Sequence, residues 1–243
     1  MTAIFRREIT AFFGSLIGYV VIGIFLLTLG LFLFVFPDTS LLNYGLATLD
    51  PFFNIVPNIF IFLIPAICMR SFAEERATGA IELLVTRPVR EIEIVLGKYF
   101  ACLTLVLLAL LPTLLYWYTV YQLGAPIGNI DGGGTLGSYL GLAFLAAGMT
   151  GIGIFASALT SNQIVGFLVG TLLCFFLYFG FDYLSRLPFL IGRGDDIVES
   201  FGLFYHYESL GRGLLDTRDL IYFISIAGLF IVLTMVVLER KRG

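Results

Sequence analysis

The stretch RSFAEERATGAIELLVTRPVREIEIVLGK, residues 70–98, is a charged block between two long apolar runs. It holds five of the fourteen Lys and Arg residues and five of the seventeen acids of the chain. Charges at this density are too costly for hydrocarbon, so the block must lie in water. It is also rich in helix-forming residues, and a solvated helical surface of this kind invites a protein partner. The alternative is an amphipathic linker that rests on lipid head groups.

The composition is that of an integral membrane protein. The chain has 243 residues, 59% of them hydrophobic and 13% charged, with a mean hydropathy of +0.99. An ordinary soluble domain carries about 25% charged residues. The net charge of −3 and the pI near 5.1 argue against nucleic-acid binding, which requires basic patches. Cys68, Cys102 and Cys174 lie in or beside apolar runs and indicate neither a disulfide framework nor a metal site.

Six apolar runs are long enough to cross a bilayer, which takes about 20 helical residues. The first run is too long for the apolar region of a signal peptide, and no cleavage pattern follows it, so we expect it to remain as a span. We therefore predict an all-α membrane protein with one transmembrane domain over residues 1–243. Its spans are predicted at about residues 16–36, 52–69, 99–121, 139–158, 164–183 and 220–238.

The cationic residues predict the orientation, because cytoplasmic loops close to spans retain Lys and Arg. With a cytoplasmic N-terminus, the first two outer loops carry no cation and four cations share the outer loop 184–219. We expect this loop to be a solvated cap, with short interfacial helices at its apolar patches LPFLIG (187–192) and ESFGLFYHY (199–207) as the alternative. Both termini are therefore predicted to be cytoplasmic. The ten cations on that side are then Arg6, Arg7, Arg70, Arg76, Arg87, Arg90, Lys98, Arg240, Lys241 and Arg242.

A short amphipathic helix is predicted before the first span. Phe5, Ile9, Phe12 and Phe13 follow a helical spacing and fall on one face. A helix of this kind lies in the membrane interface. The alternative is a charged cap that simply continues the first span.

Gly166 and Gly170 form the sequence GFLVG in the fifth span. Small residues at this spacing let two helix backbones approach closely. We expect this helix-packing seam to serve contacts within the chain, with a seam between two copies as the alternative.

No motif for catalysis is found in the sequence. The segment GIGIFA at residues 151–156 has dinucleotide-binding spacing but lies inside an apolar run, where neither the required strand nor a helix N-terminus is present. No phosphate-binding P-loop sequence occurs. The chain is therefore predicted not to be an enzyme, and any ATP would bind another subunit.

The remaining polar candidates carry weaker arguments. His206 and Glu208 are the nearest approach to a metal or acid/base pair, but a single histidine without companions favours a loop surface. Asp182 is an acid embedded in an apolar run, which makes it a functional candidate, although the nearby interface would let it reach water.

Within the charged block, local signals predict a helix followed by a turn. Ser71 is a candidate N-cap, and it would place Glu74 and Glu75 in the first turn, where the helix dipole favours anions. Pro88 disfavours helix at Arg87, so the helix would end there and a new one would begin near Glu91. A rigid rod between two spans would transmit movement from a soluble motor to the membrane helices.

The block strongly resembles the coupling segment of type-2 ABC exporter permeases. Further stretches, such as FLIPAICMRSFAEE at 62–75 and GSYLGLAFLAAGMTGIGIFASALTSNQIV at 137–165, are similar to the gliding-motility-associated (GldF-type) permeases of that family, and the resemblance covers nearly the whole chain. The residues that match the coupling pattern are Glu74, Glu75, Arg76, Gly79, Glu82, Leu83, Leu84, Thr86, Pro88, Gly97 and Lys98.

The resemblance implies six spans, an N-terminal elbow helix, a coupling helix between the second and third spans, and a dimer with a second copy or a sister permease. It also implies a separate cytoplasmic ATPase subunit that holds ATP and Mg, a multi-pass location in the bacterial inner membrane, and contact with an envelope or accessory subunit. No cofactor is expected in this chain. The residues that it implies for ATPase coupling are Phe72, Glu74, Glu75, Arg76, Gly79, Glu82, Leu83, Leu84, Thr86 and Pro88.

Three functions follow as hypotheses. The first is the permease subunit of an ATP-driven exporter. The second is a non-transporting mechanical or scaffold component of an envelope machine that uses the same ATPase coupling. The third, a membrane enzyme or secondary transporter, is disfavoured because the spans contain so few ionisable groups.

Overall fold

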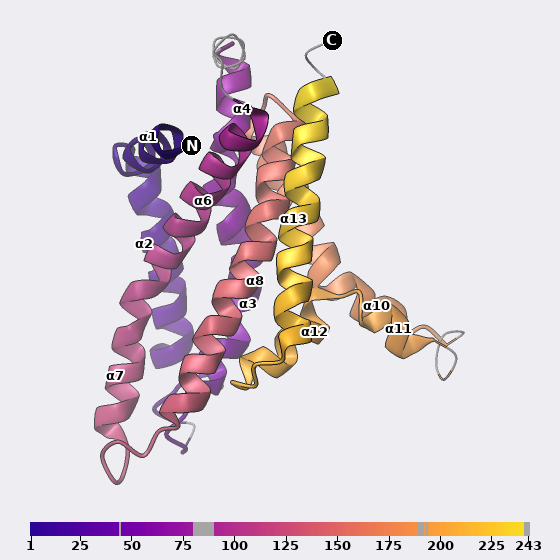
Figure 1. Ribbon diagram of the computed structural model, residues 1–243. Coiled ribbons are helices and arrows are strands. Elements are labelled where there is room, and N and C mark those ends of the chain that lie inside the picture. The colour runs from indigo at the N-terminus through magenta and orange to yellow at the C-terminus, as the bar shows by residue number, and fades with distance from the viewer. Residues whose placement is uncertain (44, 80–89, 189–191, 193, 241–243) are drawn as a thin grey trace.

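The computed structural model describes residues 1–43, 45–79, 90–188, 192 and 194–240. Every regular element in these residues is a helix, as predicted for an all-α protein. The long helices run roughly side by side, and both termini lie at one end of the bundle, the upper end in Figure 1. We call this end the terminal end, and the other the opposite end.

Six helical segments are long and apolar enough to cross a membrane, and the six predicted spans fall one in each. The prediction of six apolar helices of membrane-spanning length is therefore confirmed. The segments are Leu16–Val35 (α2, Leu16–Gly30, and η1, Leu31–Val35), Asp50–Ala77 (α3, Asp50–Cys68, and α4, Arg70–Ala77), Glu91–Leu123 (α6, Glu91–Leu110, η2, Leu111–Thr113, and α7, Leu114–Leu123), Gly132–Leu159 (α8), Gln163–Ser185 (α9, Gln163–Phe175, η3, Phe176–Gly180, and α10, Phe181–Ser185) and Thr217–Arg240 (α13).

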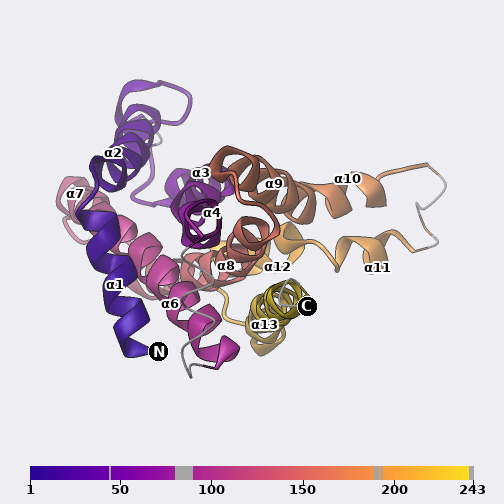
Figure 2. The same cartoon turned by 90° about the horizontal axis from the view of Figure 1, so that it is seen from above.

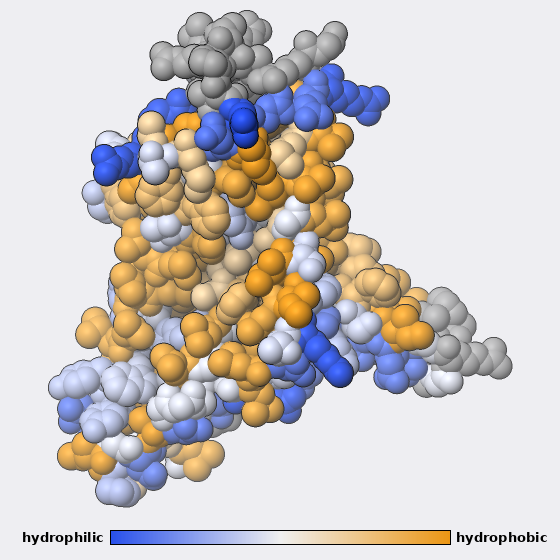
Figure 3. All heavy atoms as spheres, in the orientation of Figure 1, coloured by the Kyte–Doolittle hydropathy of each residue, from blue (hydrophilic) through white to orange (hydrophobic). Residues whose placement is uncertain are grey.

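Helix α8 forms the centre of the bundle. It packs against α3, α4, α6, α9, α12 and α13, and Figure 2 shows it surrounded by these neighbours. In its most apolar 18 residues 72% are buried, against 22% in each of the first, fifth and sixth segments. The outer segments turn their apolar side chains outward, and Figure 3 shows the resulting apolar band with hydrophilic residues toward both ends. Exposing an apolar band of this extent to water would be unfavourable, so the exposed surface fits a lipid bilayer.

A short helix precedes the first span, as the sequence predicts. Helix α1, Thr2–Phe13, lies across the terminal end of the bundle and packs on α6. Its predicted apolar face is half-buried, whereas Arg6, Arg7 and Thr10 are exposed. The two helices meet closely at Gly97, where an added Cβ would lie 3.1 Å from Cγ2 of Ile4.

The described part of the segment between the fifth and sixth spans contains two helices. Helix α11, Asp195–Glu199, lies beside α10, and the two project sideways from the bundle in Figures 1 and 2. Helix α12, Leu203–Gly211, then returns to the bundle and buries Leu203 and Leu210 completely. The expectation of a solvated cap is wrong for α12, because its apolar residues pack on α8 and α3.

The structure separates the polar candidates of this region. His206 and Glu208 do not form a pair: Nδ1 of His206 lies 2.7 Å from Oδ1 of Asp219 on α13, and Glu208 pairs with Arg212. The second ring nitrogen of His206 lies 2.9 Å from the carbonyl oxygen of Ser200. The ring therefore fastens α12 to α13. Asp182 is buried and pairs with Arg186 one turn later, which accounts for an acid in an apolar run.

The glycines of GFLVG face the inside of the bundle. Gly166 lies against Thr160 and Ser157, and Gly170 lies against Pro65 of α3 and Ala156 of α8. Contacts within the chain therefore use the small-residue face of α9.

Replacing Gly170→Leu is expected to destabilise the bundle, because a Cβ there would lie 3.1 Å from Cβ of Pro65. Overpacking of this kind costs about 1–3 kcal/mol, so the melting temperature of the purified chain in detergent should fall. Gly228→Leu is the matched control, since a Cβ built at Gly228 meets nothing within 4 Å. Equal melting temperatures for the two variants would contradict this packing.

Candidate functional site

The second span continues into the first part of the charged block, so that α3 and α4 form one rod over Asp50–Ala77. Between α3 and α4, Met69 keeps helical dihedral angles (φ −55°, ψ −31°), so no new helix begins at the block. The prediction of Ser71 as an N-cap is therefore wrong. Ser71 is instead buried inside the rod, where its Oγ lies 3.1 Å from Sγ of Cys102 on α6.

The rod is fixed to the centre of the bundle through Ser157 of α8. Its hydroxyl oxygen accepts from the backbone N–H groups of Phe72 (3.0 Å) and Ala73 (3.2 Å) and donates to the carbonyl oxygen of Met69 (2.9 Å). The side chain of Phe72 is buried beside it. A single serine thus satisfies backbone groups at the junction of α3 and α4, where regular helical bonding is interrupted.

The predicted coupling residues fall into two groups. Phe72, Glu74, Glu75 and Arg76 lie on α4, and Gly79 follows it with φ +71°, a left-handed conformation that is typical of a glycine ending a helix. The second group lies outside the described residues and consists of Glu82, Leu83, Leu84, Thr86 and Pro88. The turn predicted at Pro88 lies there as well.

A buried lysine joins α4 to two other helices. The side chain of Lys98 on α6 has no exposed surface, and its Nζ lies 2.7 Å from Oε1 of Glu8 on α1 and 3.0 Å from Oε2 of Glu75 on α4. Nζ also donates to the carbonyl oxygen of Ser71 and lies 5.0 Å from the ring centroid of Phe72. The contact with Glu75 is an ion pair without an aligned hydrogen bond.

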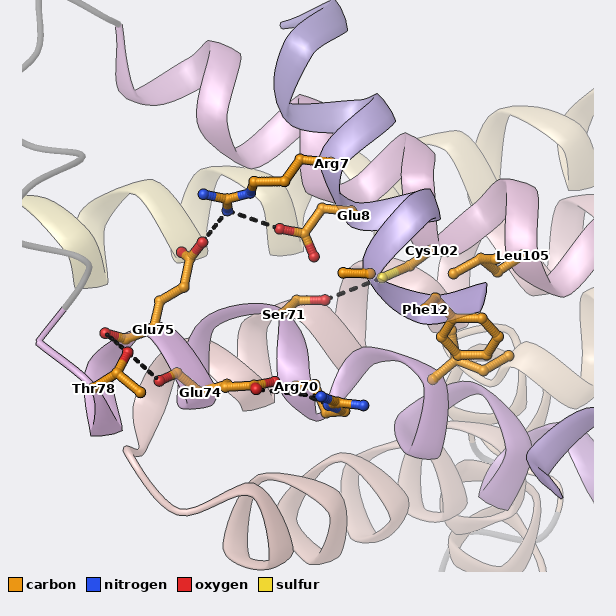
Figure 4. Close-up of a pocket in the computed structure, with 12 residues that line it drawn as sticks. Arg7, Glu8, Phe12, Arg70, Ser71, Glu74, Glu75, Thr78, Cys102 and Leu105 are labelled. Atoms are coloured by element: carbon orange, nitrogen blue, oxygen red, sulfur yellow. Dashed lines mark hydrogen bonds and ion pairs between the residues drawn. The ribbon is translucent and has the colours of Figure 1, made fainter. Parts of the chain in front are cut away.

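A second cation completes this cluster. Arg7 on α1 contacts both Glu75 and Oε1 of Glu8, the latter at 3.0 Å, as Figure 4 shows. Burial alone would lower the pKa of Arg7, but the hydrogen bond to Glu8 and the charges of Glu75 and Glu8 raise it above its ordinary value. We call Arg7, Glu8, Glu75 and Lys98 the charge cluster. Its two cations and two anions link α1, α4 and α6.

The cluster makes these three helices depend on one another. A buried ammonium is costly unless anions and hydrogen-bond acceptors surround it, and here carboxylates from two helices and a carbonyl from one of them do so. Removing α1 or α4 would strip the lysine of a partner. A large displacement of α4 must therefore move α1 and α6 with it or break the cluster.

The charged residues of α4 face different surroundings. Glu75 points inward, with 12% of its side chain exposed, whereas the side chain of Glu74 is 42% exposed and pairs with Nε of Arg70 at 2.9 Å. Arg70 in turn donates to Oγ of Ser15 at 3.1 Å, at the junction of α1 and α2. Arg76 forms no ion pair within the described residues, and its Nη1 is buried there without a hydrogen-bond partner.

Sequence reasoning missed the partners of the block. Lys98 carried a signal, since it follows Gly97 at the start of a long apolar run, but nothing local pointed to Glu8, ninety positions earlier. Ser157 is a small polar residue in an apolar span, where such residues often hydrogen-bond to a neighbouring helix.

Among the described residues, no group of three or more His, Cys, Asp or Glu side chains is placed to hold a metal.

Comparison with known proteins gives one match. The sequence model described as ABC-2 family transporter protein matches residues 37–191, which is more than half of the chain. A search of curated proteins finds no match.

Replacing Lys98→Met should loosen α1, because Glu8 and Glu75 would then face each other with only Arg7 between them. Breaking a buried ion pair costs about 3–5 kcal/mol. Amide hydrogen exchange over residues 2–13, measured on the purified chain, should become faster. Arg6→Met is the control, since Arg6 is exposed on α1 and makes no ion pair within the described residues.

Adding Glu8→Gln to Lys98→Met should restore part of the protection, because it removes one of the two carboxylates that are left with Arg7 as their shared cation. Unchanged exchange in the Lys98→Met variant would show that the charge cluster does not hold α1.

Proposed function

This chain belongs to the ABC-2 transporter family, and from that membership we propose that it is the permease subunit of an ATP-driven exporter associated with gliding motility. The family makes the chain a multi-pass membrane subunit that works with an ABC ATPase. The exporter direction and the link to gliding motility are supported by the sequence resemblance described above. The proposed location is the bacterial inner membrane, with both termini in the cytoplasm.

The observation that carries this proposal is the continuous rod of α3 and α4. A partner that moves the end of α4 would move the second span directly, because no hinge separates them at Met69. The charge cluster would pass the same movement to α1 and α6. We propose that α4 and the following segment 80–89 form the coupling site, and that ATP and Mg are held by the ATPase subunit.

The contacts of α4 suggest which of its residues meets that subunit. Glu74 and Glu75 each form an ion pair with a cation of this chain. Arg76 forms no ion pair with any of the described residues. A partly buried guanidinium without a partner favours an acidic side chain supplied from outside. We therefore propose Arg76 as a direct contact of the ATPase, with Glu75 holding the cluster behind it.

A polar strip on α3 favours transport over the alternative of a mechanical scaffold. The exposed residues of α3 recur at every fourth position, at 50, 54, 58 and 62. The first three of them, Asp50, Asn54 and Asn58, are polar and form the strip. Nδ2 of Asn58 donates to the carbonyl oxygen of Asn54 at 2.8 Å, so this amide is partly satisfied within the strip. Polar side chains inside a span usually face a water-filled path or another protein.

A hollow lies along the strip. A cavity of about 410 Å³ lies between α3, η3 and α12, and Asn54, Asn58, Tyr178 and Tyr207 line it. We propose that the strip and the cavity form one wall of the export path, closed by a second copy or a sister permease. A scaffold would need no such polar wall.

Replacing Arg76→Glu is expected to weaken binding of the cognate ATPase subunit by about tenfold or more, the effect of losing a charge-assisted hydrogen bond. Binding would be measured by pull-down of the ATPase with the detergent-solubilised chain. Arg240→Glu makes the same charge change at the exposed end of α13 and serves as the control. Equal binding by both variants would count against Arg76 as the contact.

Replacing Asn58→Cys should give a thiol that a small water-soluble methanethiosulfonate reagent modifies in membranes. The control is Leu168→Cys on α9, whose side chain is also exposed but should face lipid, where the thiol is not ionised. The native cysteines are all buried and should contribute little background. Labelling of the position 58 variant no faster than the control would contradict a water-filled path along α3.

A further inference from the structure

We propose that the cavity between α1 and α4 binds the head group of a zwitterionic phospholipid that carries a primary ammonium, such as phosphatidylethanolamine. The cavity has a volume of about 300 Å³ and is shown in Figure 4. The proposal concerns lipid binding and does not depend on the export direction proposed above.

The position of the cavity is the first argument. Its floor is apolar and comes from three helices, with Phe12 of α1, Ile67 of α3 and Leu105 of α6. Its rim is charged, with Arg7, Arg70 and Glu74 among the lining residues. Helix α1 lies where the apolar band of the surface gives way to hydrophilic residues in Figure 3. The cavity is therefore at head-group depth, with its apolar side toward the hydrocarbon.

The rim offers a donor for a phosphate. The guanidinium of Arg70 donates to both carboxylate oxygens of Glu74, at 2.9 and 3.2 Å, and to Oγ of Ser15. These bonds leave further N–H groups of the guanidinium for an additional acceptor. Arginine is well suited to phosphate oxygens because its N–H groups are fixed in one plane.

The same rim offers an acceptor for an ammonium. The side chain of Glu74 is 42% exposed, so its oxygens remain accessible beside Arg70. Carboxylate oxygens accept more than one hydrogen bond each. A head group that lies along the pair would place its phosphate near Arg70 and its ammonium near Glu74.

The charge balance selects the class of lipid. The lining contains the cations Arg7 and Arg70 and the carboxylates of Glu8, Glu74 and Glu75. Lys98 behind the lining brings the balance to three cations and three anions, so an anionic lipid gains no net attraction. A choline head group has no N–H to donate to Glu74. A primary ammonium with a phosphate satisfies both sides of the rim.

The test measures how phospholipids stabilise the purified, delipidated full chain. Melting temperatures would be recorded in detergent with added phosphatidylethanolamine, phosphatidylcholine or phosphatidylglycerol of identical acyl chains. Phosphatidylethanolamine should stabilise at lipid concentrations about tenfold lower than the other two. Equal effects of the three lipids would overturn the proposal, since they would indicate non-specific annular lipid.

Two variants locate the effect. Ala11→Trp fills the cavity from α1 without changing any charge, and it should abolish the preference for phosphatidylethanolamine. Ala3→Trp places the same side chain at an exposed position of α1 outside the lining and should keep the preference. Persistence of the preference in Ala11→Trp would place the lipid elsewhere and overturn the proposal.

A third variant tests the chemistry. Glu74→Gln should reduce the preference over phosphatidylcholine, because an amide is a weaker acceptor for an ammonium.

Binding of the ATPase subunit to the Ala11→Trp variant shows whether the cavity receives a lipid or the ATPase. Loss of ATPase binding with an unchanged lipid preference would show that the cavity receives the ATPase, which would overturn the lipid assignment and leave the proposed function standing.

Discussion

The structure at the terminal end depends on a lysine ammonium that has no access to water. Burying this ammonium would be costly without Glu8, Glu75 and the carbonyl of Ser71, which surround it. These groups come from α1 and α4, so the position of each helix is a condition for the stability of the other. Apolar packing alone would tolerate sliding between helices, since it is non-directional. The ion pairs fix the positions of α1, α4 and α6 along one another.

The charge cluster is attached to the rod of α3 and α4, so it connects α1 and α6 to the second span. Helix α4 continues α3 through Met69, and Ser157 fastens this junction to α8, the most buried helix. The rod is therefore anchored at this junction, and α4 extends beyond the anchor to Ala77. A force applied at the end of α4 would turn the rod about this junction, which is buried in the core of the bundle. The charge cluster contacts α4 between the junction and that end.

The sequence predicted what depends on local pattern and missed what depends on distant contacts. The six spans followed from apolar length, because a bilayer imposes that length on each segment separately. The cap at Ser71 was wrong because serine has a local preference for caps, whereas the apolar packing of Phe72 and the bonds from Ser157 keep the helix continuous. The pairing of His206 with Asp219 could not be predicted, since α12 had to be placed against α13 first.

The shared ion pairs of the charge cluster suit the movement of α4 that we propose. Arg7 contacts both Glu8 and Glu75, and Lys98 contacts the same two acids. Each anion is thus shared by two cations, so a small shift of α4 can lengthen one contact while the other persists. A single pair would have to break completely and would leave a buried charge behind. Shared partners lower that barrier and keep every charge compensated. In the proposed coupling, the cluster would therefore let α4 move by small steps while it remains coupled to α1 and α6.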